Sequence, residues 1–470
     1  MTPPATGFCH VVAVPYPSRG HVNPMINICR QIAFRKPDNL LITFVVTEEW
    51  LGLIGPDPTT APDNLRFATI PNVVPSVHDR AKDIIAFVKA VWTKMEAPFE
   101  ELLDRLEVPV SAIVADNNLF WAFDFANRRN IPVASLWTMS ASMFSVFYHF
   151  DLLKQNGHYP VDDLSEKGHE VVDYIPGIPT TRLADLPGEL LRTDNSNEKI
   201  KQKLLETTWR VYKAQAQYLL STSVYELESQ VIDVLKAQFP FPVYTIGPSI
   251  PYSQLDQTCN ASQSNNVPDY LKWLDSQPKE SVLYVSFGSS LSVASAQLDE
   301  IVAGLKISGT RYLQVVRGDA SKIVEEYGNC EELGFVVPWC DQLRVLSHAS
   351  IGGFWTHCGW NSTLEAVFCG VPILTFPIAW DQVSNSKQIV EDWKIGYKVK
   401  KGIGGDNLVT KDEIAELLKR FMDPKNKERK LIREKAKELQ KVCLGAIAKD
   451  GSSDSNLNAF IRDISLGHGR

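Results

Sequence analysis

Short apolar runs alternate with longer helical stretches along most of this chain, and no other feature narrows the possible folds so far. Strands of the first half are expected at 11–14, 40–47, 65–70, 111–115 and 133–136. Helices are expected between them, at about 22–35, 79–106 and 119–129. Strands that alternate with helices form a parallel sheet covered by helices on both faces.

The same pattern starts again in the second half. Strands are expected at 282–287, 312–316, 335–337, 353–355 and 372–376, with helices at about 295–308, 361–369 and 384–393. A chain of 470 residues exceeds the roughly 250–300 residues at which single cores stop growing. We therefore predict two doubly wound α/β domains that face each other across a cleft.

The domain boundaries follow from local composition. Residues 248–267 are rich in Ser, Gln, Asn and Pro and predict a linker. This gives a first domain at 1–247, a second at 268–445, and a C-terminal helix at 446–470 that packs back on the first domain. A stretch rich in Pro and Gly at 172–190 predicts a long surface loop.

Charge and cysteine usage exclude several classes of protein. The formal net charge of -7 argues against nucleic acid or an anionic membrane as the main partner. The eight cysteines include no Cys-x-x-Cys pair, so neither a zinc site nor a disulfide framework is predicted. The most apolar window, 134–153, contains His149 and Asp151, which disfavours a membrane span. We expect a cytoplasmic monomer.

Two residues of the first half are candidates for proton transfer. His21 follows the first strand and Asp116 ends the fourth, and in doubly wound folds these two strands flank the point where ligands bind. A carboxylate beside an imidazole fixes its tautomer and suits a general base. The alternative is that each residue only caps a helix. Gly20 stands alone without a Gly-x-Gly-x-x-Gly pattern, which counts against a nicotinamide or flavin enzyme.

The segment 356–365 joins a strand to a helix and favours an anion site. A glycine followed by polar residues at a helix start exposes backbone N–H groups at the positive end of the helix dipole. His357 adds a donor, and the turn at Gly288 and Ser289 adds further N–H groups. A capping box formed by Ser362 and Glu365 is an equally good interpretation of the same residues.

Further polar and aromatic residues follow neighbouring strands. Trp339 is a flat surface on which a base can stack, or else a core or rim tryptophan. Asp381 and Gln382 suit sugar hydroxyls, or else belong to a solvated loop or a helix cap. No Asp-x-Asp pair occurs in the chain, so a metal that bridges a diphosphate is not predicted. The leaving diphosphate would be neutralised by the helix terminus and His357.

Together these residues resemble the signature box of plant UDP-dependent glycosyltransferases that act on small molecules. The resemblance covers residues 339–382 and includes Trp339, Gln342, the run Gly352-Gly353-Phe354-Trp355-Thr356-His357-Cys358-Gly359-Trp360-Asn361-Ser362, Glu365 and Asp381-Gln382. The motifs at 20–24, 114–116, 136–138 and 286–289 stand in the order expected for that family. The box departs from the common pattern at Cys340 and Asp341, where many members have Ala and Pro.

The resemblance implies a fold of the GT-B type, with two Rossmann-like domains, and glycosyl transfer with inversion and without metal or another cofactor. It implies that His21, supported by Asp116, deprotonates the acceptor. Contacts to UDP-glucose are implied for four groups of residues: Trp339 and Cys340 on uracil; Gln342 and Glu365 on ribose; His357, Asn361, Ser362 and Ser289 on the diphosphate; and Trp360, Asp381, Gln382 and Thr138 on the sugar. Gln382 favours glucose over galactose.

We therefore expect an inverting transfer of glucose to a hydroxyl or other nucleophile of a small, largely apolar acceptor such as a phenolic or terpenoid. Candidates for an aromatic-rich acceptor pocket are Phe120, Trp121, Met143, Phe144, Phe147 and Trp380; core packing is an equally good interpretation for each. The alternative functions are a non-catalytic protein that binds sugar nucleotides and a nucleotide-dependent oxidoreductase.

Overall fold

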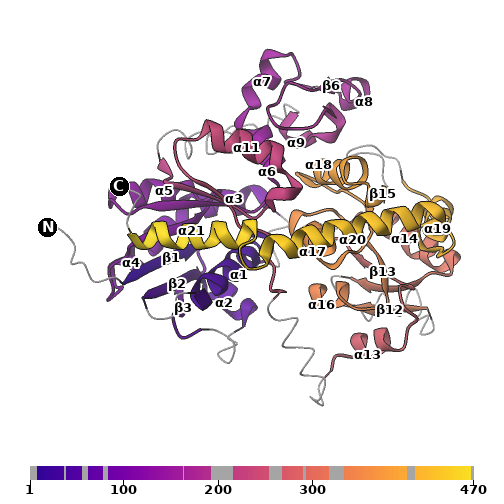
Figure 1. Ribbon diagram of the computed structural model, residues 1–470, viewed down its shortest axis with the longest axis horizontal. Helices are drawn as coiled ribbons and strands as arrows, with labels where there is room; N and C mark the ends of the chain where they lie inside the picture. The colour runs from indigo at the N-terminus through magenta and orange to yellow at the C-terminus, as the bar shows by residue number, and fades with distance from the viewer. Residues whose placement is uncertain are drawn as a thin grey trace.

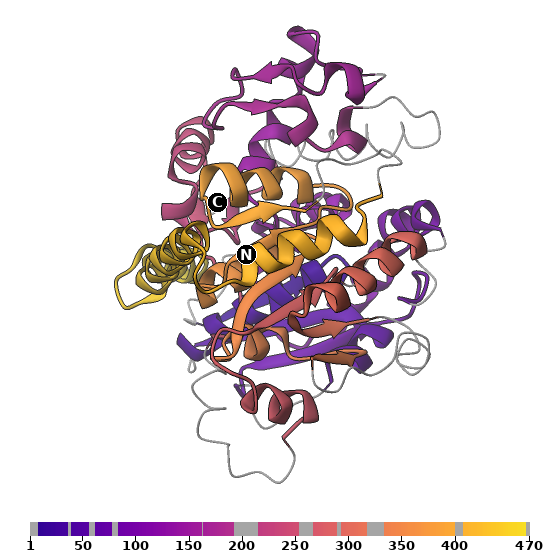
Figure 2. The same ribbon diagram turned by 90° about the vertical axis from the view of Figure 1, so that its right-hand side faces the viewer.

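The computed structural model contains two parallel β-sheets, each covered by helices (Figures 1 and 2). The structure describes residues 8–35, 39–55, 62–77, 83–161, 163–191, 215–252, 267–288, 293–316, 333–399 and 408–466. The first sheet has the strand order β3-β2-β1-β4-β5-β8-β9 and the second the order β12-β11-β10-β13-β14-β15. The predicted α/β class with two doubly wound domains is confirmed.

The first sheet contains the five expected strands close to their predicted limits, because each is a short and mainly apolar run, and two further strands. They are β1 (Cys9–Val14), β2 (Leu40–Thr47), β3 (Leu65–Ile70), β4 (Ala112–Asp116), β5 (Val133–Trp137), β8 (Tyr218–Ser221) and β9 (Val243–Thr245). All neighbours in this sheet are parallel. β1 lies beside β4, as the fold rule for strands one and four requires.

The helices of the first half are α1 (Arg19–Arg35), α2 (Glu48–Ile54), α3 (Ile84–Lys94), α4 (Glu96–Asp104), α5 (Phe120–Arg128), α6 (Ala141–Tyr148), α7 (Phe150–Gln155) and α11 (Ser229–Gln238). The single helix expected at 79–106 is wrong: α3 ends at Lys94 and α4 starts anew at Glu96. Pro98 explains the break, since it has no N–H to bond the carbonyl of Lys94 and is tolerated only in the first turn.

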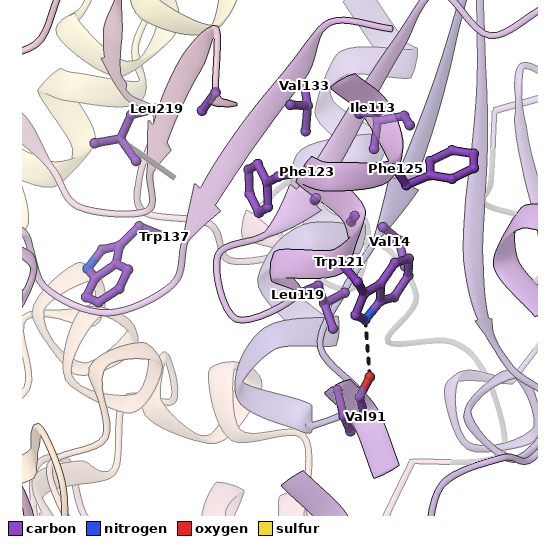
Figure 3. Packing of buried hydrophobic residues seen from close by; sticks show 14 of the residues in the cluster. Val14, Val91, Ile113, Leu119, Trp121, Phe123, Phe125, Val133, Trp137 and Leu219 are labelled. Atoms are coloured by element: carbon purple, nitrogen blue, oxygen red, sulfur yellow. Dashed lines mark hydrogen bonds between the residues drawn. The ribbon is translucent and has the colours of Figure 1, made fainter. Parts of the chain in front are cut away.

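Apolar side chains from α3, α5 and the strands fill one core of the first half, shown in Figure 3. The indole N–H of Trp121 donates to the carbonyl oxygen of Val91 at 3.1 Å, so its single polar atom is satisfied inside the core. Phe123 and Phe125 of the same helix are fully buried. This packing fixes α5 directly behind the end of β4, where Asp116 stands.

The second sheet consists of β10 (Val282–Ser286), β11 (Arg311–Val315), β12 (Gly334–Val337), β13 (Ile351–Thr356), β14 (Ile373–Thr375) and β15 (Gly396–Lys398). Its helices are α13 (Asp269–Asp275), α14 (Ser295–Ser308), α16 (Gln342–Leu346), α17 (Trp360–Cys369), α18 (Gln382–Lys387) and α19 (Lys411–Met422). The helix expected at 384–393 begins earlier, as α18, and continues as the π-helix η4 (Gln388–Asp392).

Residues 156–191 form a small folded unit that projects at the top of Figure 1. The surface loop expected at 172–190 is therefore wrong. The unit contains α8 (Leu164–Lys167), β6 (Val171–Val172), β7 (Thr181–Arg182), the 3-10 helix η1 (Leu183–Asp185) and α9 (Gly188–Leu191). Its leucines, including Leu183, Leu186 and Leu190, are buried in an apolar cluster with Val146 of α6, which holds the segment against the first half.

Two C-terminal helices, α20 (Lys427–Ile447) and α21 (Ser452–Leu466), run in line across both halves in Figure 1. Helix α20 buries Ala436 and Cys443 in the core of the second half. Helix α21 buries Leu457, Phe460 and Ile464 against the first sheet. The domain limits at 247 and 268 stay a prediction, since most of the expected linker lies outside the described residues. Among the described residues, no helix combines the length and the apolar character needed to cross a membrane.

Candidate active site

His21 and Asp116 meet at the carboxyl edge of the first sheet. His21 lies in the first turn of α1 and Asp116 is the last residue of β4. The His21 Nδ1 atom lies 2.7 Å from Asp116 Oδ2, although the two residues are 95 positions apart. Asp116 is 1% exposed and its other oxygen accepts the N–H of Asn118 at 3.0 Å. The carboxylate thus supports the imidazole as well as the local turn.

The contacts of His21 define its chemistry. Because the buried carboxylate accepts a hydrogen bond from the Nδ1–H group, the neutral imidazole keeps an unprotonated Nε2, which is the form of a general base. The Thr138 hydroxyl lies 3.1 Å from Nδ1, and the Tyr16 ring packs against the imidazole with a centroid distance of 5.2 Å. These neighbours hold the ring in one orientation, while the side chain of His21 keeps 19% exposure.

The start of α17 carries uncapped backbone N–H groups. Its N-cap residue is Gly359, which makes no side-chain cap hydrogen bond, and Cys358 before it has a φ of 69°. The first N–H groups of the helix, which lack a side-chain cap and stand at the positive end of the helix dipole, suit an anion. The anion site is thus favoured over the capping box, whose two members, Ser362 and Glu365, accept hydrogen bonds from Gln342 of another helix.

His357 is packed between two glycines beside the start of α17. A Cβ atom at Gly288 would lie 2.4 Å from the His357 Nε2 atom, and one at Gly359 would lie 2.6 Å from it. Gly288 also has a φ of +80°, which L side chains rarely adopt. The position of the His357 ring therefore depends on the absence of side chains at both glycines. Ser289, expected beside it, lies outside the described residues.

Gln342 organises the region expected to hold ribose. Its Nε2 donates to Ser362 Oγ at 2.9 Å and to the Glu365 carboxylate, and its Oε1 accepts from the Tyr284 hydroxyl at 3.1 Å. Burial raises the pKa of Glu365 to about 7. Asp341, where the chain departs from the family pattern, caps α16 by accepting the N–H of Arg344 at 3.1 Å. The turn is thus preserved by a different cap.

The two residues that open the signature box differ in exposure. Trp339 is 63% exposed, which is unusual for a large aromatic side chain and removes the alternative of a core tryptophan. Cys340 is 5% exposed and its Sγ lies 3.3 Å from the Tyr284 hydroxyl, so its backbone alone remains for a ligand. The arrangement offers a planar surface next to backbone polar groups.

Residues 380–382 follow β14 and carry the groups expected at the sugar. Trp380 has a φ of 58°. The Asp381 carboxylate accepts from Asn385 Nδ2 at 2.8 Å, and burial raises its pKa to about 6. Gln382 Oε1 accepts the N–H groups of Ile378 at 2.8 Å and Ala379 at 3.1 Å. This orients the Gln382 amide so that its NH2 group remains as a donor.

Trp360 lies at the start of α17 with its side chain largely buried. The side chain is 3% exposed and packs on Trp393 with a centroid distance of 6.1 Å. The N–H of Trp360 at the uncapped helix start is a group that can face a donor. The expected place of this residue around the sugar stays a prediction.

The acceptor-pocket candidates fall into two groups. Trp121 and Phe144 are 2% and 1% exposed and lie in the core cluster, which favours the interpretation as core packing for these two. Met143 is also buried but borders a small cavity between α6 and α18. The remaining candidates are partly or largely exposed: Phe120, Phe147 and Trp380, the last of them at 43%.

Two residues that help to build the site were missed from the sequence: Asn385 as the partner of Asp381, and Glu189 as a contact of Trp380. Asn385 stands four residues after Asp381, a spacing that places two side chains on one helix face and was a usable signal. Glu189 had no such signal. Within the described ranges, no group of three or more His, Cys, Asp and Glu residues is placed to hold a metal ion.

Comparison with known proteins agrees with this geometry. A family model described as "UDP-glucoronosyl and UDP-glucosyl transferase" matches residues 60–430. The chain is 49% identical to UDP-glycosyltransferase 87A1 of Arabidopsis thaliana, covering 96% of this chain and 99% of that protein. It is 35% identical to 7-deoxyloganetin glucosyltransferase of Catharanthus roseus, covering 96% of each. The solved structure of Phytolacca americana UGT2 with UDP-2fluoro-glucose and pterostilbene superposes with a TM-score of 0.78 at 26% identity, over 97% of this chain and 100% of that one.

Proposed function

Because this chain belongs to the plant family of UDP-glycosyltransferases, we propose that it transfers glucose from UDP-glucose to a hydroxyl, or another nucleophile, of a small and largely apolar acceptor. Its class is that of an enzyme that moves a glycosyl group from a UDP-sugar to small molecules. Glucose as the sugar, the apolar acceptor and inversion at the anomeric carbon are our proposal.

One observation carries the proposal: the His21–Asp116 pair, with its 2.7 Å contact, lies beside the uncapped start of α17. A base for the acceptor and a cradle for a diphosphate are the two requirements of a direct displacement at the anomeric carbon. The amide of Asn361, at the start of α17, reaches the carbonyl oxygen of Gly20 at 2.8 Å, next to His21. Base and anion cradle are therefore neighbours.

We propose a single displacement. Nε2 of His21 takes the proton of the acceptor hydroxyl, whose oxygen forms a bond to C1 of glucose while the bond from C1 to the diphosphate oxygen breaks. UDP leaves with the electrons of that bond, and attack from the opposite face turns an α-linked donor into a β-glucoside. Asp116 stabilises the imidazolium that forms. The N–H groups at the start of α17, together with His357, stabilise the negative charge on the leaving diphosphate.

Donor contacts are proposed from the positions of the signature-box residues. Uracil stacks on the exposed ring of Trp339, and the ribose hydroxyls bond to Gln342 and Glu365. Asn361, Ser362 and Ser289 bind the diphosphate. Asp381 and the free NH2 group of Gln382 bind hydroxyls of the hexose, with Thr138 nearby. This set of donors and acceptors supports glucose as the preferred sugar.

A largely apolar acceptor is supported by the partly exposed rings of Phe120, Phe147 and Trp380. It is also supported by the relatives: one is named for 7-deoxyloganetin, and one solved structure holds pterostilbene. We further propose that the enzyme needs no metal, since the sequence has no Asp-x-Asp pair, and that it works as a monomer in the cytoplasm.

The test is a mass-spectrometric screen of phenolic and terpenoid acceptors with UDP-glucose and, in parallel, UDP-galactose. We expect products heavier by one hexose with UDP-glucose, a β-anomer by NMR, and equal activity in EDTA. Binding of UDP-glucose without UDP release on any acceptor would instead support a non-catalytic binding protein.

A further inference from the structure

Glu189 connects the small unit at 156–191 to the loop that carries Asp381 and Gln382. It belongs to α9 in the first half, and its half-buried carboxylate accepts the backbone N–H of Trp380 in the second half. The two oxygens lie 3.4 Å and 3.3 Å from that nitrogen. The contact therefore spans 191 positions of the chain and both halves of the molecule.

Trp380 has a backbone conformation that needs outside support. Its φ of 58° lies in the left-handed region, which is a true outlier for a bulky aromatic residue. Such conformations persist only when surrounding contacts fix them. The N–H of Trp380, turned outward in this conformation, points at the carboxylate of Glu189.

A second contact fixes the other end of the same loop. The Ser384 hydroxyl donates to the carbonyl oxygen of Asp185 at 2.8 Å, and the Asp185 carboxylate pairs with Lys398 at 3.1 Å. Residues 185–189 of the first half thus hold residues 380–384 of the second half at both ends. Asp381 and Gln382 lie between these two points.

We propose that Glu189 is a positioning residue for donor-sugar recognition. Its hydrogen bond with the Trp380 N–H fixes the direction in which Asp381 and Gln382 face the hexose of a nucleoside diphosphate sugar. This inference rests on the proposed function, since it assigns the sugar to those two residues. Glu189 touches the loop and not the reacting atoms. We therefore expect Glu189 to affect the binding of the sugar and not the binding of the nucleotide.

The charge of Glu189 acts on the same site. Burial is the main cause of the raised pKa of Asp381, the Glu189 carboxylate raises it further, and His21 of α1 lowers it. The other titratable group near this carboxylate is the buried thiol of Cys358 at the turn before α17. Neutralising Glu189 is thus expected to lower the pKa of Asp381. If Glu189 acted only through its hydrogen bond and not through its charge, its neutralisation would leave the pKa of Asp381 unchanged.

The experiment compares the affinities for UDP-glucose and for UDP by isothermal titration calorimetry. Glu189→Ala is expected to weaken UDP-glucose about tenfold, the equivalent of one lost charge-assisted hydrogen bond, while UDP stays within about twofold. Glu189→Gln keeps an acceptor oxygen and should keep most of the affinity. The loss of UDP-glucose affinity on acidification should then occur at lower pH, because the pKa of Asp381 is lowered. Glu166→Gln, on exposed α8, is the charge-matched control and should change neither ligand.

Equal weakening of both ligands, or no change in either, overturns the proposal, as does a wild-type protein that does not bind UDP-glucose. Because the readout is binding, it does not depend on turnover: a wild type that binds UDP-glucose but transfers no sugar defeats the proposed function and leaves this test intact. If Glu189→Ala does not fold, Glu189→Asp withdraws the carboxylate by one methylene. An intermediate loss for UDP-glucose alone is then expected.

Discussion

The side-chain amide of Asn361 donates a 2.8 Å hydrogen bond to the carbonyl oxygen of Gly20, the residue before His21. Asn361 stands in the first turn of α17, and Gly20 in the first turn of α1. The helix start that we assign to the donor diphosphate is therefore bonded directly to the helix start that carries the base.

Asn361→Asp removes the hydrogen that is donated to Gly20 and places a carboxylate beside the proposed diphosphate. We expect the KM for UDP-glucose to rise on the order of 10- to 100-fold, since an unpaired charged group costs about 1.5–3 kcal/mol. Steady-state kinetics measure this. Asn458→Asp on the exposed face of α21 is the control. An unchanged KM would show that the bond has no part in donor binding.

His21→Ala removes the proposed base. Turnover of a hydroxyl acceptor is expected to fall by about 10²- to 10⁴-fold, the usual contribution of a general base, while UDP binding is unchanged. Asp116→Asn should also lower turnover, because a neutral amide no longer stabilises the imidazolium, and its NH2 group can donate to Nδ1 and favour the wrong tautomer. His169→Ala, an exposed histidine, is the control. A near-normal rate for His21→Ala would falsify the assignment.

Gly288→Ala tests whether the position of the His357 ring depends on the absence of a side chain at residue 288. The new Cβ would lie 2.4 Å from His357 Nε2, at a φ of +80° that strains any L side chain, so the imidazole must move away. We expect weaker UDP binding, measured by calorimetry. Gly52→Ala is the matched control, since nothing lies within 4 Å of its Cβ and it sits inside α2. That change should raise stability by about 0.5–1 kcal/mol. Equal UDP affinity in both variants would contradict the role of Gly288.

The stability of the protein is expected to depend on Glu365 between about pH 4.5 and pH 7. Its folded pKa, about 7, lies above the ordinary value of 4.5, so the folded state holds the proton more tightly than the unfolded state. Stability is then lost as the pH rises through this window. Glu365→Gln removes the effect, and urea unfolding at pH 8 should give it about 1–3 kcal/mol more than wild type, with little difference at pH 4.5. A difference that does not vary with pH would exclude Glu365 as the cause.

Phe460→Ala tests the packing of α21 on the first sheet. Phe460 is fully buried and contacts the rings of Tyr218 at 5.7 Å and Tyr244 at 6.0 Å. The loss of such a side chain typically costs about 3–5 kcal/mol. The urea midpoint should therefore fall strongly. Leu466→Ala on the same helix, where the side chain is 61% exposed, should change stability by less than about 0.5 kcal/mol. Similar effects of the two changes would mean that α21 contributes little to the fold.

The strands and the His21–Asp116 pair were predictable because their signals are local or follow a fold rule. β2 (Leu40–Thr47) is a continuous apolar run, and its limits were predicted to the residue. The proximity of His21 and Asp116 followed from the adjacency of strands one and four. The capping box at Ser362 and Glu365 failed as a guide because Gln342, from another helix, occupies both side chains. Glu189 was not predictable, since its partner is a backbone N–H whose direction depends on the unusual φ of Trp380.

The placement of α21 has a consequence for how the chain is made. The first sheet ends at β9, yet its core includes Leu457, Phe460, Ile461 and Ile464, about 200 residues further along the chain. At about 5–20 residues per second, a ribosome needs on the order of 10–40 s to reach them after β9 has been synthesised. During that interval the nascent first half carries an uncovered apolar strip. The earliest part of the protein to be synthesised is thus among the last to be completed, and a chaperone that shields this strip would act before the second half has folded.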